Sequence, residues 1–312
     1  MPRPVWRCRW SSGCASCHSV CRVWWPGRSP RAASYPAERA VSAVRNRGRP
    51  SDKPEGFSMH AVLLAAGLGR RLDRITGGGP KCLLPFEGKS LLERHLRHLA
   101  AAGVHRLSVV VGSEAMQIEQ ALSAVVPDAA PEMTVDTVHN AAFREGSAGS
   151  VMAARDIMSG DDDVLLMDAD VLYDDRLLAR FVGAGAPDRL AIDCSVAADD
   201  AEAVKVALAD GRVVAFDKNL PADLDYDTVG ESVGFFRLSP ASARRVLEAC
   251  VAVHAADADA PHEAALQQVM CAADSAFEAA DITGLPWIEI DYPDDVTHAE
   301  ADVLPRLEDH AR

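Results

Sequence analysis

Short apolar runs alternate with amphipathic segments between residues 60 and 170, and this alternation restricts the possible folds more than any other feature of the sequence. Four runs have the length and composition of buried strands, at residues 60–66, 106–112, 133–139 and 164–167. Three segments between them are expected helices, at residues 90–102, 114–126 and 147–158. Helices between strands imply right-handed crossovers, and therefore a largely parallel sheet with helices on both faces.

The second half of the chain has a different pattern. Its expected strands lie at residues 189–197, 204–209, 212–218, 233–238 and 287–291, and its expected helices at 240–254, 262–273 and 293–308. Asp210-Gly211 is a hairpin signal between two of these strands. We therefore predict an α/β protein with a three-layer, Rossmann-like fold. Its mixed sheet is expected to be mostly parallel with a small antiparallel insertion.

The charge distribution divides the chain near residue 58. The formal net charge is −14, yet residues 1–58 contain ten Arg and one Lys against three acidic residues. We interpret residues 1–58 as a leader that is disordered or that results from a wrongly assigned start, and residues 59–312 as one domain beginning at Met59. A zinc cluster is the alternative for the leader, because Cys8, Cys14, Cys17, His18 and Cys21 lie close together in sequence.

Composition also limits the partners. An acidic chain is not typical of proteins that bind nucleic acid, and no run approaches the roughly 18 apolar residues of a membrane span. We expect neither nucleic acid nor a membrane as partner. The four cysteines after residue 58 are scattered, which favours reduced thiols and a cytoplasmic location. The oligomeric state stays open.

A glycine-rich loop follows the first expected strand and reads Leu64-Ala-Ala-Gly-Leu-Gly-Arg-Arg71. Glycines in this position let backbone N–H groups approach phosphates. Two known phosphate motifs do not fit. A dinucleotide fingerprint needs a third glycine where Leu72 stands. A Walker A motif before Gly88-Lys-Ser90 needs a glycine where Leu83 stands, so that tripeptide is better explained as a turn and a helix cap.

The loop, Pro80-Lys81 and Gly88-Lys89 together resemble nucleotidyltransferases that couple nucleoside triphosphates to small phosphate monoesters. The resemblance extends over residues 59–312 and implies a nucleotidyltransferase fold in which the loop wraps the triphosphate. It implies phosphate contacts by Arg71 and Lys81. The nucleotide-binding residues that it implies are Leu64, Ala65, Ala66, Gly67, Gly69 and Ser147. Lys81 is one of only four lysines after residue 58, which makes a chance match less plausible.

Two carboxylates, Asp168 and Asp170, follow the very apolar strand at 164–167. Ligands of open α/β sheets bind beyond the carboxyl ends of the strands, and Mg²⁺ prefers oxygen ligands there. We favour Asp170 as a magnesium ligand that Asp168 orients. The alternative is a solvated loop, which is our interpretation of residues 161–163.

The segment Trp287-Ile-Glu-Ile-Asp291 resembles the corresponding tail of bacterial choline-phosphate and related cytidylyltransferases. The resemblance implies that Asp291 is the second magnesium ligand, that Lys218 is catalytic, and that Glu231 and Trp287 border the acceptor. Taken alone, Trp287 is better explained as a packing residue, and Lys218 equally well as a surface lysine at a strand end.

The resemblance implies a Mg²⁺-dependent enzyme that transfers a nucleotidyl group, CMP from CTP being favoured, to a small phosphate or phosphonate acceptor. Phosphocholine and 2-aminoethylphosphonate are examples of such acceptors. Because the attacking oxygen is already anionic, no side-chain nucleophile is required. A sugar-1-phosphate nucleotidyltransferase that uses UTP or dTTP and a non-catalytic nucleotide sensor remain as alternatives.

Overall fold

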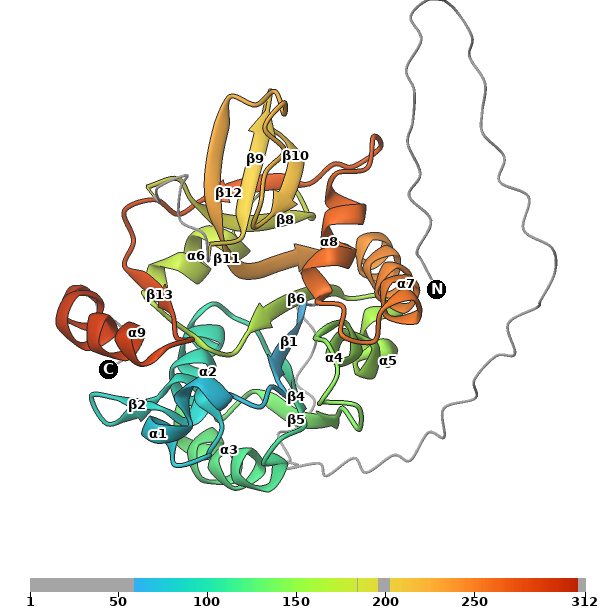
Figure 1. Cartoon of the computed structure of the whole chain (residues 1–312). Coiled ribbons are helices and arrows are strands. Elements are labelled where there is room, and N and C mark those ends of the chain that lie inside the picture. Colours follow the sequence, from blue (N-terminus) through green and yellow to red (C-terminus); the bar gives the residue numbers. More distant parts are fainter. Residues whose placement is uncertain (1–58, 184, 196–202, 308–312) are drawn as a thin grey trace, which may run out of the picture. The chain divides into compact units, whose positions relative to one another are not determined.

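The computed structural model describes residues 59–183, 185–195 and 203–307, so the expectations for residues 1–58 lie outside the described residues. Four parallel strands form one half of a nine-stranded sheet: β1 (Met59–Ala65), β4 (Arg106–Val111), β5 (Thr134–His139) and β6 (Asp163–Asp168) (Figure 1). They are ordered β6-β1-β4-β5. Within this sheet, β1 pairs on one side with β4, the next strand of the sheet, and on the other with β6, which begins 104 positions after β1. The chain therefore switches sides at β1.

The other half of the sheet contains antiparallel pairs. Its strands are β8 (Arg189–Asp193), β9 (Lys205–Ala209), β10 (Arg212–Asp217), β11 (Thr228–Leu238) and β12 (Glu278–Asp281). The long strand β11 is antiparallel to β6, β8 and β9, and β12 runs parallel to β8. The expected mixed, Rossmann-like sheet is confirmed, but its antiparallel part is larger than the sequence indicated.

Helices cover both faces of the sheet (Figure 1). One face packs against α2 (Leu91–Ala101), α3 (Ala115–Ala129) and α6 (Asp175–Val182), and the other against α4 (Ala148–Ala153), α5 (Arg155–Met158), α7 (Pro240–Ala256) and α8 (His262–Met270). Alternation within β1 explains the two cores. Leu63 packs with the first set of helices, whereas Val62 packs with the second, because successive side chains of a strand point to opposite faces.

Several small elements lie outside the nine-stranded sheet, near the carboxyl ends of its parallel strands. They are α1 (Asp73–Thr76), the hairpin β2 (Pro85–Phe86) and β3 (Lys89–Ser90), the pair β7 (Val171–Tyr173) and β13 (Trp287–Glu289), and α9 (Pro293–His298). The Ser90 hydroxyl accepts a hydrogen bond from the Glu93 N–H (3.1 Å), so Gly88-Lys-Ser90 is a turn and a helix cap as predicted.

Several boundaries differ from the sequence prediction. The helix expected at 147–158 is interrupted at Ala154, and the one expected at 293–308 continues beyond α9 as a π-helical segment, Ala299–Val303. Strands β7 and β12 and helix α6 were not expected.

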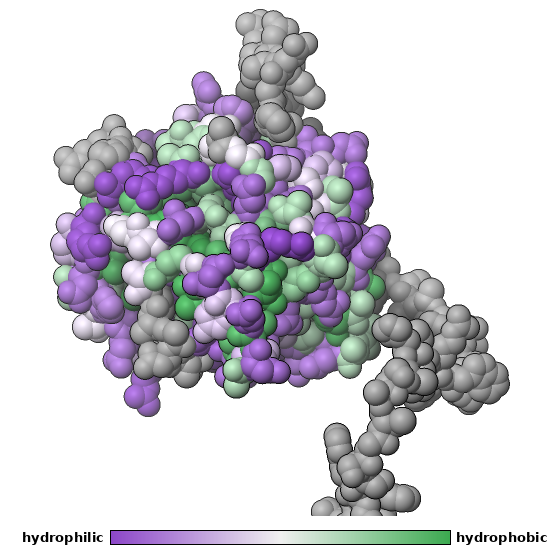
Figure 2. All heavy atoms as spheres, turned by 90° about the horizontal axis from the view of Figure 1, so that it is seen from above, coloured by the Kyte–Doolittle hydropathy of each residue, from purple (hydrophilic) through white to green (hydrophobic). Residues whose placement is uncertain are grey.

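Hydrophilic side chains are spread among hydrophobic ones on the face in Figure 2. Among the described residues, no helix has the length and hydrophobicity needed to cross a membrane.

Candidate active site

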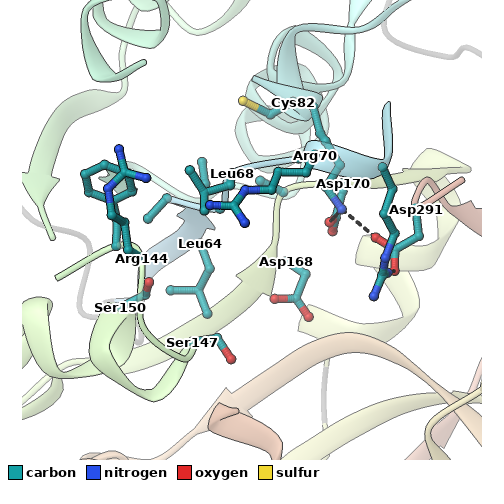
Figure 3. Close-up of a pocket in the computed structure, with 18 of the residues that line it drawn as sticks. Leu64, Leu68, Arg70, Cys82, Arg144, Ser147, Ser150, Asp168, Asp170 and Asp291 are labelled. Carbon is teal, nitrogen blue, oxygen red and sulfur yellow. Dashed lines mark hydrogen bonds and ion pairs between the residues drawn. The ribbon is translucent and has the colours of Figure 1, made fainter. Parts of the chain in front are cut away.

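A pocket of about 400 Å³ opens at the carboxyl ends of β1 and β6, where the strand order switches sides. The loop after β1 forms one wall, and the Asp168-Ala-Asp170 turn after β6 forms another (Figure 3). This volume is in the range of pockets that bind small molecules. Ten of the predicted site residues line it: Leu64, Ala65, Ala66, Gly67, Gly69, Arg71, Lys81, Ser147, Asp170 and Asp291.

Lys81 lies at the centre of the charged part of the pocket. Its Nζ is 2.5 Å from Asp170 Oδ2 and 2.6 Å from Asp291 Oδ1. Burial alone would lower the pKa of Lys81, but the charges of Asp170 and Asp291 outweigh it and raise the pKa above its usual value. The lysine is therefore a permanent cation between two carboxylates.

Gly69 allows Lys81 to reach this position. The glycine has φ +60°, and a Cβ on it would lie 2.9 Å from Lys81 Cγ. A larger residue would thus be strained in its backbone and would collide with the lysine stem. Gly69, the second glycine of the loop, is therefore needed because the Lys81 side chain lies against its Cα. This reason adds to the close contact between backbone and phosphate that the sequence suggested.

Three hydrogen bonds from backbone N–H groups place Asp291 beside Asp170, which is 121 positions earlier in the chain. The Ile290 N–H donates to the Asp170 carbonyl (2.9 Å), in continuation of the β7–β13 pairing. The Asp295 carboxylate accepts from the N–H groups of Asp291 (2.8 Å) and Tyr292 (2.6 Å). The Asp291 backbone is therefore fixed by the first turn of α9.

Arg71 binds the other side of Asp291. Its Nη1 donates to Asp291 Oδ2 (2.8 Å), and its guanidinium lies 4.8 Å from the centre of the Tyr292 ring. Burial alone would raise the pKa of Asp291, but Lys81 and Arg71 outweigh it and lower the pKa. Asp291 is therefore ionised and available to a cation at neutral pH.

Glu289 is a third carboxylate of this group, which the sequence prediction missed. Oxygen atoms of Asp170, Glu289 and Asp291 all lie within 4.8 Å of one another. Residues two apart in an extended segment point to the same side, so the spacing Glu289-Ile-Asp291 already contained the signal. Three carboxylates suit a hard divalent cation such as Mg²⁺.

The charge balance supports this fit. Desolvation of the Glu289 carboxyl, and then the negative charges of Asp170 and Asp168, raise the pKa of Glu289 to about 9. Burial raises the pKa of Asp168 to about 7, although His262 opposes the rise. Full ionisation of these four carboxyl groups would place more negative charge here than Lys81 and Arg71 neutralise, so Glu289 keeps a proton at neutral pH. A bound cation would take the place of that proton.

The remaining predicted residues lie outside the lining of this pocket. The Trp287 Nε1–H donates to Asp193 Oδ2 (2.9 Å), which fixes its half-buried ring. Glu231 lies in β11 opposite Asp193 of β8 and Lys205 of β9. Lys218 follows β10, and its positive charge helps to lower the pKa values of Asp291 and Glu263. The pocket is also lined by Phe143, Arg144 and Ser150, and by Cys82, which the sequence did not single out for it.

The model of the MobA-like NTP transferase domain matches residues 61–281, which include β1, the glycine-rich loop and the Asp168–Asp170 turn. The chain belongs to this family. The match ends before Glu289 and Asp291, so these two members of the three-carboxylate group are assigned from the geometry of the structure.

Relatives of this MobA-like domain include a bifunctional IPC transferase and DIPP synthase of Rubrobacter xylanophilus, 32% identical over 246 residues (78% of this chain, 52% of the relative). A CMP-5'-(3-aminopropyl)phosphonate synthase of Streptomyces rubellomurinus is 29% identical over 269 residues (84% and 42%). A 2-aminoethylphosphonate cytidylyltransferase of Lancefieldella rimae is 31% identical over 121 residues (38% and 45%). The chain spans about half the length of these relatives or less.

Among solved structures, the inositol-1-phosphate CTP transferase from T. maritima has the same fold, with a TM-score of 0.64 over 80% of this chain and 96% of that chain. The sequence identity is 20%. This similarity supports the three-layer nucleotidyltransferase fold.

Proposed function

We propose that the protein is a cytidylyltransferase that transfers CMP from CTP to a small phosphate or phosphonate acceptor. An acceptor oxygen attacks the α-phosphorus, the bond to the β-phosphate oxygen breaks, and pyrophosphate leaves. The observation that carries the proposal is the single pocket that combines the glycine-rich loop, Lys81 and the carboxylates of Asp170 and Asp291. All the parts needed to hold a triphosphate beside a cation are thus within reach of one another.

The roles follow from charge and position. The backbone of Ala66–Gly69 faces the pocket and is suited to the nucleotide, while Arg71 and Lys81 neutralise the phosphates. Asp170 and Asp291, with Glu289 beside them, would hold Mg²⁺, which supplies charge neutralisation at the phosphates. Without ligand, Lys81 and Arg71 pair with these carboxylates. When substrate binds, the two cations would turn to the phosphates and the carboxylates would bind the metal ion.

The base and the acceptor class are supported by the relatives. Two of them are named for CMP- or cytidylyl transfer to amine-bearing phosphonates. An amine-bearing acceptor also suits a pocket lined by several carboxyl groups, Asp168 among them. We place the acceptor toward Glu231 and Trp287, with Lys218 near the phosphates. A cation over the indole ring would contribute about 0.5–2 kcal/mol.

A matrix of substrates tests the proposal. The four ribonucleoside triphosphates and dTTP are each combined with phosphocholine, 2-aminoethylphosphonate, inositol-1-phosphate or glucose-1-phosphate, with Mg²⁺ or with EDTA, and pyrophosphate release is measured. We expect release with CTP and an amine-bearing acceptor only when Mg²⁺ is present. Release only with glucose-1-phosphate and UTP or dTTP would instead assign a sugar-1-phosphate nucleotidyltransferase. No release with any pair would contradict an enzymatic function.

A further inference from the structure

Ser147 lies on one wall of the pocket (Figure 3), and backbone hydrogen bonds on either side of it join its loop to residues 258–260. The Gly146 N–H donates to the Ala258 carbonyl (2.9 Å), and the Ala148 N–H donates to the Ala260 carbonyl (3.2 Å). These two bonds lie on either side of Ser147 and tie it to the segment that leads into α8. The position of its hydroxyl is therefore fixed by tertiary contacts and not only by its own loop.

The Ser147 hydroxyl oxygen has two neighbours on the same residue. The backbone N–H of His262 donates to Ser147 Oγ (2.9 Å), and the Nδ1 atom of His262 lies 2.9 Å from the same oxygen. Nδ1 is also 3.1 Å from Glu263 Oε2. A ring nitrogen flanked by a hydroxyl oxygen and a carboxylate oxygen is compatible with both only if it carries a proton.

The charge state of His262 agrees with this geometry. Its side chain is 3% exposed, and burial alone would lower its pKa, but the charges of Glu263 and Asp168 raise it to about 9. Nε2 has no hydrogen-bond partner among the described residues, and its nearest acidic neighbour is Asp168 Oδ1, at 3.9 Å. The ring is thus a buried imidazolium whose Nδ1–H donates to Ser147 Oγ. The Glu263 carboxylate is a charge neighbour of the ring, and its Oε2 has no hydrogen-bond partner among the described residues.

A serine hydroxyl has one proton to donate and two sites at which it accepts. In Ser147 both accepting sites are used by His262, so the hydroxyl proton is left to point elsewhere. Because Ser147 lines the pocket, the open direction for this proton is toward a bound ligand.

We propose that His262 is a positioning residue that makes the Ser147 hydroxyl a hydrogen-bond donor toward an acceptor atom of the bound nucleotide. This inference rests on the proposed function for the identity of the ligand. It gives the buried histidine a role that neither the metal ligands nor the phosphate-binding cations require. Without the Nδ1–H, the hydroxyl would be free to turn toward the ring and would offer its lone pairs to the pocket.

Four variants test the inference by calorimetric titration with CTP, without acceptor. Ser147→Ala and His262→Leu remove the donor and the group that orients it, and each should weaken CTP binding about five- to tenfold, as expected for one hydrogen bond. His262→Asn places an amide N–H near the position of Nδ1 and should stay within about threefold of the wild type. The double variant should bind CTP no more weakly than Ser147→Ala alone, because the two residues act through one contact.

Steady-state kinetics add a second readout. The KM for CTP should rise in His262→Leu, while the KM for the acceptor and kcat stay close to their original values. Equal weakening by His262→Leu with and without Ser147 would overturn the inference, as would a failure of His262→Asn to restore binding. A rise of the acceptor KM in place of the CTP KM would also overturn it.

A measurement on the unaltered protein tests the inference even if a variant fails to fold. The nitrogen chemical shifts of the His262 ring at pH 7.5 should show a protonated Nδ1, and an unprotonated Nδ1 would overturn the inference. If the wild-type chain binds CTP but releases no pyrophosphate, only the proposed function fails. If it turns over CTP and the variants do not follow the expected pattern, only this inference fails. If it does not bind CTP, both fail.

Discussion

At the residue scale, Asp170 and Asp291 provide the most direct test of the site. Replacing either with Asn should reduce turnover about a hundredfold or more, because an electrostatic contact to a reacting phosphate is lost. Stability should change little, since in either variant Lys81 keeps the other carboxylate as an ion-pair partner. Pyrophosphate release at saturating Mg²⁺ and the midpoint of thermal unfolding measure the two effects.

Asp161→Asn is the matched control. This side chain is fully exposed, and among the described residues it pairs with Arg244 alone (2.8 Å), an exposed ion pair of the kind that contributes little. We expect its activity and stability to stay near those of the original chain. Equal activity in all three variants would contradict the assignment of the metal site.

The neighbouring Asp163 shows where interpretation of single residues from sequence was wrong. We took residues 161–163 as a solvated loop, but Asp163 is buried and its carboxylate is 2.9 Å from the guanidinium of Arg237. The partner lies 74 positions away, on β11. Sequence shows that an aspartate is present, whereas its burial depends on a strand pairing that no local pattern contains.

At the scale of elements, Gly234 links β11 to the site. It has φ +78° and lies at an irregularity in the pairing of β11 with β8. A Cβ at this position would collide with the Asp168 carboxylate. Gly234→Ala should therefore displace Asp168 and reduce turnover by more than the loss of stability alone explains.

Gly211→Ala separates this effect from backbone strain. Gly211 has a similar φ of +75°, in the hairpin between β9 and β10, but among the described residues no atom beyond its chain neighbours lies within 4 Å of its Cβ position. The substitution should cost about 1 kcal/mol of stability and leave turnover unchanged. If both variants lose activity equally, Gly234 has no specific connection to Asp168.

His60, on β1, connects three parallel strands through side chains. Its Nε2–H donates to Ser108 Oγ of β4 (2.9 Å), and the Ser108 hydroxyl donates to Asp136 of β5. Burial, and then the charge of Arg106, lower the pKa of His60 from 6.5 to about 4. In this arrangement the neutral imidazole is the donor that the serine needs.

This shift predicts a stability that depends on pH. Between about pH 6.5 and 4 the unfolded chain binds a proton at His60 that the folded chain does not, so stability falls as the pH decreases through this window. The full effect is on the order of 3 kcal/mol. Urea unfolding at pH 7.5 and 4.5 should show a smaller loss for His60→Gln than for the unaltered chain. Equal losses would contradict the role of His60.

The same elements show what patterns predict and what they do not. The four parallel strands were expected because their apolar runs are clear and are separated by amphipathic helices. Strands β7 and β12 have only three and four residues, and β7 is held by its pairing with β13 from the C-terminal region. Such short elements are stabilised by distant partners and leave little periodicity in the sequence.

At the scale of the whole molecule, the site depends on the order of the strands. The resemblance indicated the glycine-rich loop, Lys81, Asp170 and Asp291 one by one. Their common position follows from β1 lying between β4 and β6, together with the return of residues 287–291 beside β7. The ion pairs of Lys81 with two carboxylates 89 and 210 positions later are a consequence of that arrangement.

The last prediction concerns a chain that begins at Met59. The nine-stranded sheet, its two cores and the pocket lining are built from residues 59–307, so removal of residues 1–58 should leave them intact. Because tolerance to truncation follows from the contacts of the removed segment, we expect an unchanged unfolding temperature and turnover within about twofold. Thermal unfolding and pyrophosphate release of the shortened and full-length chains, compared in the same buffer, decide this. Failure of the shortened chain to fold, or stoichiometric zinc retained by residues 1–58, would contradict our interpretation of the leader.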